Sequence, residues 1–269
     1  MALAATGAVG LIAAGAFTEL AATAAAACHA RVSVIAGAQG SPDDLAWNGN
    51  QLLVSDINRG TIGAVVDRHV RTLIGHIREP EGIVPRSPDQ LEVAEQATNR
   101  VLAVNLARHS RTPIVSLPSL PNKTGVDDIE AAPDSGTYVP DSANGDLYLL
   151  RGRHLTLLAA GMVRPVGVAR WAGGLAVADE YASVVWLIRG RQRSQLAPLP
   201  VPDDLTTAGG HLIAVSLLGG VWEIAPHLRL LASGFHSPQG LVADGRDAVI
   251  VADQTTNTLY RVAGLSACL

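Results

Sequence analysis

A short segment recurs six times between residues 41 and 243, and this repetition constrains the fold more than any other feature of the chain. In each copy a turn leads into an apolar residue that is expected to begin a strand. The copies are SPDDLAW (41–47), EPEGIVP (79–85), GVDDIEA (125–131), RPVGVAR (164–170), VPDDLTT (201–207) and SPQGLVA (237–243). Their apolar anchors, Leu45, Ile83, Ile129, Val168, Leu205 and Leu241, are separated by 38, 46, 39, 37 and 36 residues.

A second element follows each copy. It consists of an apolar pair, a small residue or proline, an acid, a polar turn and another apolar strand. The acids are Asp56, Glu95, Asp141, Asp179 and Asp253, while the fifth copy has Leu217. An acid that recurs once per repeat is typical of a turn in which the carboxylate bonds nearby backbone N–H groups. We therefore interpret Asp56, Asp141, Asp179 and Asp253 as structural.

The repeats predict an all-β protein. Each repeat holds about four short strands and no convincing helix, and such a unit cannot bury its faces alone. Stacked radially, neighbouring sheets cover one another, and a period near 40 residues is typical of a propeller blade. Residues 31–269 are thus predicted to form a six-bladed β-propeller. The segment RVSVIAG (31–37) lacks a turn before it, and the last repeat lacks an outermost strand. We expect the N-terminal strand to close the last blade.

Residues 1–30 form a separate, Ala-rich segment without Lys or Arg. We interpret it as a signal peptide, with a disordered leader as the alternative, and no transmembrane segment is expected. The protein is therefore predicted to be extracytoplasmic, either secreted or periplasmic. A closed ring would bring Cys28 close to Cys268, so a disulfide is expected in an exported protein. Lipidation of Cys28 is the minor alternative.

Charge and aromatic content limit the class of partner. The net charge is −4 and aromatic residues make up 4% of the chain. A basic footprint for nucleic acid or an anionic membrane is absent from this composition, and a stacking platform for bases or sugars is not indicated. A small-molecule ligand or a protein partner at the propeller face is the expectation that remains.

The repeated turn supplies carboxylates that would face the axis of the ring. The residue after the proline position is expected to line the mouth, and these residues are Asp43, Glu81, Asp127, Val166, Asp203 and Gln239. The next residues are Asp44, Gly82, Asp128, Gly167, Asp204 and Gly240. Carboxylates that converge on one axis repel each other, so either their pKa values rise or a cation neutralises them. Hard oxygen ligands favour Ca²⁺ or another divalent cation over Zn²⁺.

These acids have two interpretations. All seven, Asp43, Asp44, Glu81, Asp127, Asp128, Asp203 and Asp204, are candidate metal ligands. For Asp44, Asp128 and Asp204, a hydrogen bond to nearby backbone N–H groups is the structural alternative.

Two histidines and four tryptophans complete the list of candidate residues. His76 and His236 lie in loops just before predicted inner strands and are candidate general bases, with an exposed structural histidine as the alternative. The tryptophans recur near blade strands and are expected to pack in the core or between blades. They are Trp47, Trp171, Trp186 and Trp222.

The repeats resemble those of the senescence-marker-protein/gluconolactonase family and of NHL-repeat proteins. The resemblance rests on Pro-Asp-Asp-Leu at 42–45 and 202–205, Pro-Glu-Gly-Ile at 80–83, and Val-Ala-Asp at 177–179 and 251–253. It implies a divalent cation held in the mouth by acidic and Asn side chains, with Asp43 and Asp203 at acidic ligand positions and Asp127 able to reach inward. The chain departs from this pattern at Val166, where an Asn ligand is expected, and at Asp43, which replaces a longer Glu.

Two functions remain open at this point. The first is a propeller that binds a small ligand or a protein partner at an acidic mouth, and the apolar Val166 favours it. The alternative is a metal-dependent hydrolase of lactones or esters, in which Asp43, Asp127 and Asp203 hold the metal. In that enzyme the metal would act as the Lewis acid, and His76 or His236 would act as the base. Whether the protein is an enzyme is thus left undecided by the sequence.

Overall fold

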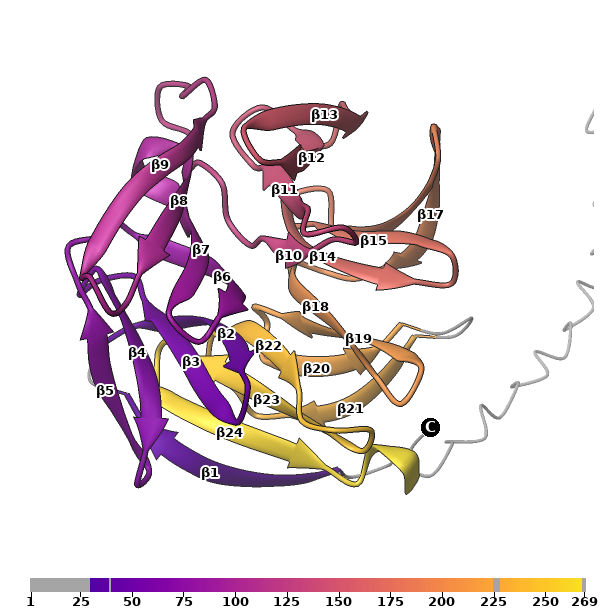
Figure 1. The fold of residues 1–269 in the computed structure, drawn as a ribbon. Coiled ribbons are helices and arrows are strands. Elements are labelled where there is room, and N and C mark those ends of the chain that lie inside the picture. The colour runs from indigo at the N-terminus through magenta and orange to yellow at the C-terminus, as the bar shows by residue number, and fades with distance from the viewer. Residues whose placement is uncertain (1–29, 39, 225–227, 268–269) are drawn as a thin grey trace, which may run out of the picture.

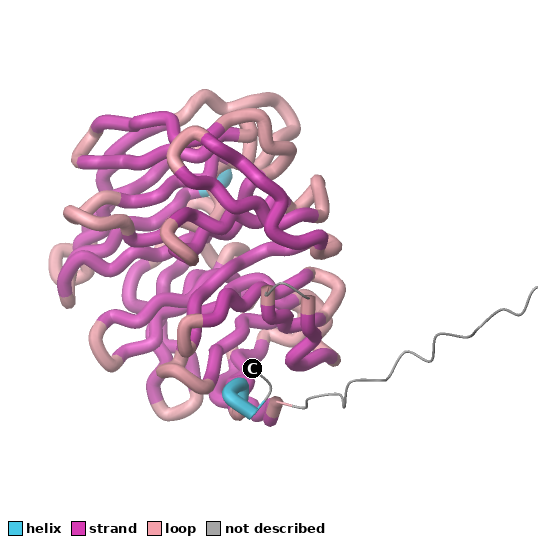
Figure 2. The backbone as a smooth tube through the Cα atoms, turned by 90° about the vertical axis from the view of Figure 1, so that its right-hand side faces the viewer, coloured by secondary structure: helices cyan, strands magenta, loops and turns pink. Residues whose placement is uncertain are grey.

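The computed structural model describes residues 30–38, 40–224 and 228–267. Within them the chain is built almost entirely from strands, with two short 3₁₀ turns at Gln96–Thr98 and Leu265–Ala267 (Figure 2). The predictions for the leader and for Cys28 and Cys268 concern residues 1–29 and 268–269, which lie outside the described residues. None of the helices in the described part of the chain is long and apolar enough to cross a membrane.

The strands form an all-β propeller in which antiparallel sheets surround a common axis (Figure 1). In the described part of the chain four sheets have four strands each, named here from the innermost strand outward. They are β6 (Pro80–Ser87), β7 (Gln90–Glu95), β8 (Arg100–Asn105) and β9 (Ser110–Ser116); β10 (Glu130–Ala131), β11 (Thr137–Asp141), β12 (Asp146–Arg151) and β13 (His154–Ala159); β14 (Pro165–Trp171), β15 (Gly174–Asp179), β16 (Val184–Arg189) and β17 (Gln192–Pro198); and β18 (Pro202–Ala208), β19 (His211–Ser216), β20 (Gly220–Glu223) and β21 (Arg229–Ser233).

The fifth sheet has eight strands, and here the structure differs from the expected six separate sheets. Its order is β2 (Pro42–Asn48), β3 (Gln51–Asp56), β4 (Thr61–Val66), β5 (His69–Ile74), β1 (Arg31–Gly37), β24 (Thr258–Ala263), β23 (Ala248–Asp253) and β22 (Pro238–Ala243). Two four-stranded units meet in it, because their outermost strands β5 and β1 share a single parallel pair, Gly37 with His69.

The N-terminal strand closes the ring as predicted. β1 pairs antiparallel with β24 from Arg31 opposite Ala263 to Gly37 opposite Thr258. It therefore supplies the outermost strand that the last repeat lacks, and the edge of β24 is covered rather than open to another chain.

Apolar side chains are buried between neighbouring four-stranded units. Among the described residues they form six clusters, and each cluster joins one unit to the next. The unit of β22–β24 and β1, for example, packs Ile250 and Leu259 against Leu45 and Val54 of β2 and β3. These junctions hold the ring together because a single four-stranded sheet leaves both of its faces to be covered.

The recurring acids have the structural role that the sequence indicated. Asp56 accepts the backbone N–H groups of Ser41 and Arg59 at 3.1 Å. Asp253 accepts those of His236 at 2.8 Å and Ser237 at 3.2 Å. Each of these two acids ends the second strand of its unit and fixes the loop that leads to the inner strand.

Trp47 connects two neighbouring units, as expected for inter-blade packing. Its indole Nε1 donates to the carbonyl oxygen of Ala243 at 2.9 Å, which links β2 to the end of β22. We predict that Trp47→Phe lowers the free energy of unfolding by about 1 kcal/mol, because the ring is largely retained and one hydrogen bond is lost. Urea denaturation measures the change. Trp171→Phe is the control, since the Trp171 indole makes no hydrogen bond within the part of the chain that the structure describes. An equal loss in both variants would contradict the assignment.

Candidate functional site

A β-bulge turns two of the three acidic doublets, Asp43–Asp44 and Asp203–Asp204, toward the axis. In β2, Pro42 is opposite Asp56 and Leu45 is opposite Val54, so the inner strand carries one extra residue between these pairs. β18 repeats this register between Pro202 and Leu205. Such a bulge frees the intervening side chains from the regular alternation of the strand and redirects them. The proline and the anchor of the repeat thus place two consecutive side chains at the axis.

All seven predicted carboxyl groups converge on one axial cavity. They line it together with the three glycines of the alternate repeats, and the space that they enclose is about 10 Å³. That is close to the least volume that holds one water molecule. The lining residues are Asp43, Asp44, Glu81, Gly82, Asp127, Asp128, Gly167, Asp203, Asp204 and Gly240.

Asp127 and Asp128 reach this cavity from a loop rather than from a strand. The inner strand of their repeat, β10, is only two residues long and begins at Glu130. Asn99 holds the loop in place, because its Oδ1 accepts the backbone N–H of Val126 at 2.8 Å. The loop therefore occupies the position of the first turn of the other repeats, although it does not form a strand.

The first carboxyls of the turns, those of Asp43, Glu81, Asp127 and Asp203, form an upper layer around the cavity. Burial raises the pKa of Asp43 to about 6, against a lowering by its hydrogen bond with Glu81. Burial, and then repulsion from Asp43 and Asp127, hold the pKa of Glu81 well above its usual range. Burial and repulsion from Asp127 do the same for the pKa of Asp203. Asp43, Glu81 and Asp203 are therefore harder to ionise than exposed carboxyls.

The second acids of the doublets form a lower layer with three-fold symmetry. Asp44, Asp128 and Asp204 each accept a backbone N–H from the next repeat, that of Ile83 at 2.8 Å, of Val168 at 3.2 Å and of Leu241 at 2.6 Å. The structural alternative for these three acids is therefore realised. They also line a second axial cavity of about 260 Å³ on the side away from the upper layer.

Three groups at the upper layer were not identified from the sequence. Gln96 Nε2 donates to Asp127 Oδ2 at 2.8 Å, and Gln254 Nε2 donates to Asp43 Oδ2 at 2.8 Å. Arg164 Nη2 donates to the same Asp127 Oδ2 at 2.6 Å. A signal was present, because both glutamines directly follow the structural acid of their repeat, Glu95 or Asp253.

The two candidate histidines do not join the carboxyls. His76 lies in a different groove of about 640 Å³, beside Arg59, Arg78 and Glu79. The side chain of His236 is 66% exposed, and its Nδ1 lies 4.0 Å from the turn acid Asp253. Neither histidine is among the residues that line the acidic cavity. The carboxyls themselves are therefore the titratable groups available there for proton transfer.

A divalent metal does not fit this set of side chains as the structure arranges them. Oδ2 of Asp43 and Oδ2 of Asp127 each accept an amide N–H, and Asp127 Oδ2 also accepts an N–H of the Arg164 guanidinium, so both of these oxygens are already bonded. Within residues 30–267, as far as they are described, no group of three or more His, Cys, Asp or Glu side chains is placed to hold a metal ion. Val166, at the position of the expected Asn ligand, is fully buried in an apolar cluster.

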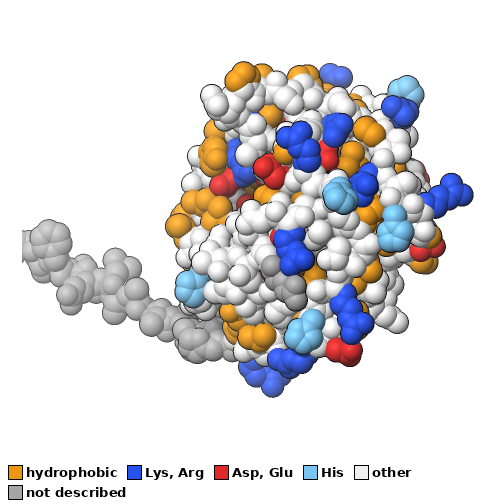
Figure 3. Space-filling model, turned by 90° about the vertical axis from the view of Figure 1, so that its left-hand side faces the viewer, with side chains coloured by type: hydrophobic (Ala, Val, Ile, Leu, Met, Phe, Trp, Pro, Cys, Tyr) orange, Lys and Arg blue, Asp and Glu red, His pale blue; other side chains and the backbone are white. Residues whose placement is uncertain are grey.

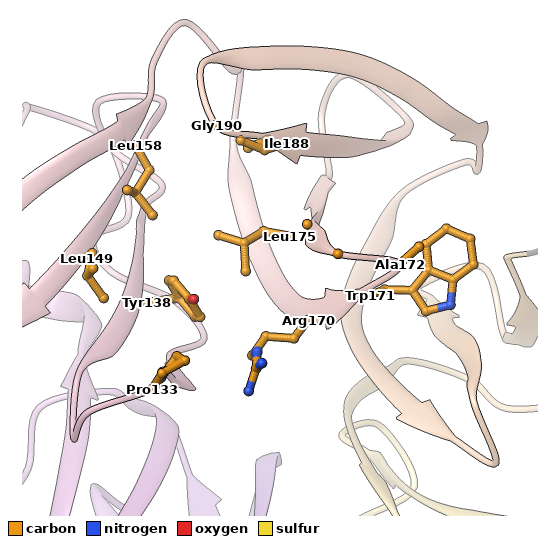
Figure 4. Close-up of a pocket in the computed structure, with 12 residues that line it drawn as sticks. Pro133, Tyr138, Leu149, Leu158, Arg170, Trp171, Ala172, Leu175, Ile188 and Gly190 are labelled. Atoms are coloured by element: carbon orange, nitrogen blue, oxygen red, sulfur yellow. The ribbon is translucent and has the colours of Figure 1, made fainter.

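A separate groove of about 490 Å³ lies between the sheet of β11–β13 and the sheet of β14–β16 (Figure 4). Leu149, Leu158 and Leu175 line it, and Arg170 projects into it from β14. This groove contains none of the predicted site residues. On the face shown in Figure 3, basic, acidic and histidine side chains are interspersed among uncharged ones.

Comparison with known proteins supports the fold. A luciferin-regenerating enzyme superposes with a TM-score of 0.74 at 17% sequence identity, over 88% of this chain and 96% of the other. A gluconolactonase from Xanthomonas campestris gives 0.73 at 16%, over 87% and 89%. The calcium-binding protein regucalcin from Agrobacterium tumefaciens gives 0.72 at 10%, over 88% and 94%. No family model and no curated protein matches the sequence. The resemblance to gluconolactonase-like propellers is thus confirmed at the level of the fold.

Proposed function

We propose that this propeller, counted as six blades around one axis, is a hydrolase of lactones or related esters that acts at the acidic mouth. The observation that carries the proposal is the convergence of Asp43, Glu81, Asp127 and Asp203 on a cavity of water size. Similarity in fold to a gluconolactonase supports the hydrolase over the alternative of a binding propeller without catalysis.

The chemistry needs a base and an acid close to one water, and the carboxyls offer both. Asp43, with a pKa of about 6, is largely ionised at neutral pH and can accept a proton from water. The water oxygen attacks the acyl carbon, and the bond between that carbon and the alkoxy oxygen then breaks. Asp203, whose pKa burial holds well above its usual range, is the acid that we propose to give a proton to the leaving oxygen. We place the substrate at the opening of the cavity, within reach of the carboxyls, because the enclosed space holds only a water-sized molecule.

We predict that Asp43→Asn and Asp203→Asn each lower kcat/KM by about 100-fold or more, because proton transfer by a positioned side chain contributes that much. Activity of the unsubstituted protein should rise with pH through about 6 as Asp43 ionises. A panel of lactones and aryl esters, followed by acid release in a pH-stat, provides the measurement. Asp134→Asn is the matched control, because Asp134 is an exposed acid remote from the mouth. If no ester or lactone in the panel is hydrolysed above the buffer rate, the hydrolase proposal fails.

The location of the protein and the class of its ligand are two further proposals. We propose export through residues 1–30 and a small-molecule ligand at the mouth. Detection of the mature N-terminus by mass spectrometry in an extracytoplasmic fraction tests the first of these. Saturable binding of a lactone without turnover would instead favour the binding propeller.

A further inference from the structure

The mouth already contains a positive charge, which comes from Arg164. Its guanidinium is bonded at all three nitrogens. Nη2 donates to Asp127 at 2.6 Å, Nη1 is paired with Glu180, and Nε donates to Thr124 Oγ1 at 3.3 Å. The side chain is only 12% exposed, and attraction to Asp203 and Glu81 adds to these contacts. A buried cation with this many partners is fixed in one position.

The backbone around Arg164 holds that position firmly. Its N–H donates to Asp179 Oδ1 at 2.8 Å, and Pro165 begins strand β14 directly after it. The guanidinium carbon also lies 5.4 Å from the centre of the Tyr181 ring, within range of a cation–π contact. The structural acid of the fourth repeat thus orients the one basic residue of the mouth among the described side chains.

The sequence shows that this arrangement belongs to one repeat. The residues that precede the turn in the other five copies are Ser41, Glu79, Gly125, Val201 and Ser237. Only the fourth copy has a basic residue there, and the same copy has Val166 in place of a side chain with an oxygen ligand. One repeat therefore lacks a possible metal ligand and carries a fixed cation beside the same carboxylates.

We propose that Arg164 is the resident cation of the axial mouth and takes the place of a divalent metal there. The single positive charge of the guanidinium is shared between the carboxylates of Asp127 and Glu180. Gln96 donates to the same Asp127 Oδ2 as Arg164, and Gln254 donates to Asp43 Oδ2. A metal ion would have to displace these donors and would be repelled by the guanidinium charge. The proposal concerns the charge of the mouth and holds whether or not the mouth is catalytic.

Metal binding to the EDTA-treated, full-length protein tests the proposal, with Mn²⁺ as the probe in equilibrium dialysis. We expect no saturable binding of Mn²⁺ to the unsubstituted protein below about 1 mM. Arg164→Gln removes the charge and keeps most of the side chain, so it should bind Mn²⁺ at least about tenfold more tightly. Adding Asp203→Asn to this variant should abolish the gain. Arg170→Ala is the control, because Arg170 lies near the other end of the same inner strand.

Two results would overturn the proposal. One is tight binding of Mn²⁺ by the unsubstituted protein that Asp203→Asn removes. The other is equal binding by the Arg164→Gln variant and the unsubstituted protein. If Arg164→Gln does not fold, Mn²⁺ binding by the unsubstituted protein still tests the proposal. Arg164→Lys is a second test, because this variant keeps the charge and should bind no more Mn²⁺ than the unsubstituted protein. Hydrolysis is measured in a separate experiment, so the Mn²⁺ binding result can be interpreted even if the protein hydrolyses no ester or lactone.

Discussion

Gly240→Ala is expected to cost about 3 kcal/mol or more of unfolding free energy, or to prevent folding, because it overpacks the ring where two inner strands touch. A Cβ at Gly240 would lie 2.7 Å from the Cα of Asp44 and closer still to the carbonyl oxygen of Asp43. Both obstacles are backbone atoms, so no side chain can move aside to relieve the contact. Urea denaturation followed by circular dichroism measures the loss.

Gly37→Ala is the matched control for this substitution. Gly37 also lies in a strand, but a Cβ there meets nothing within 4 Å, and its backbone is not left-handed. We expect the control to change stability by less than about 0.5 kcal/mol. A Gly240→Ala protein as stable as the control would show that the inner strands do not approach each other as the structure places them.

Stability is expected to fall as the pH rises from about 4 to about 7. Burial raises the pKa of Asp44 from 3.8 to about 7, although the N–H groups of Leu45 and Ile83 lower it in part. Burial likewise raises the pKa of Glu130 to about 7. In this interval the folded protein keeps protons that the unfolded chain has released, so unfolding becomes more favourable with increasing pH. For Asp44 alone the loss is on the order of 4 kcal/mol by pH 8.

Asp44→Asn should weaken this pH dependence, because the amide does not titrate and its oxygen can still accept the N–H of Ile83. Differential scanning calorimetry between pH 4 and pH 8 gives the Tm of both proteins. Asp134→Asn, which removes an exposed acid, should leave the slope unchanged. A Tm that is flat or rises over this range would show that the lower layer of carboxyls is not buried in the folded protein.

The repeat anchors were sufficient to predict most of the fold. A unit with apolar anchors and two exposed faces can only be stabilised by its neighbours, so the radial arrangement and the closure by residues 31–37 follow from the pattern. The fusion of two units into one sheet could not be predicted. It depends on the single pair between Gly37 and His69, which lie on outermost strands without a distinguishing sequence signal.

The carboxyls of the site were predictable, whereas the contact of Arg164 with them was not. A period that places Asp43, Asp127 and Asp203 at equivalent positions also places them around one axis. The position of Arg164 depends on a side-chain conformation set by Glu180 and Tyr181, and the repeats carry no information about it. His76 and His236 were chosen for their place in the chain, but loops before inner strands also extend away from the axis.

In the lower layer, repeats with an acidic doublet alternate with repeats that have a glycine at the same position. Gly82, Gly167 and Gly240 of the even repeats receive the backbone of the next repeat, where the acidic doublets stand. If two repeats with an acidic doublet were neighbours, one doublet would meet the backbone of the other. If two repeats with a glycine were neighbours, the backbone N–H of one of them would have no carboxylate to accept it. Insertion or loss of a single repeat would therefore break this alternation. A related protein with a larger or smaller ring would keep it only by gaining or losing repeats two at a time.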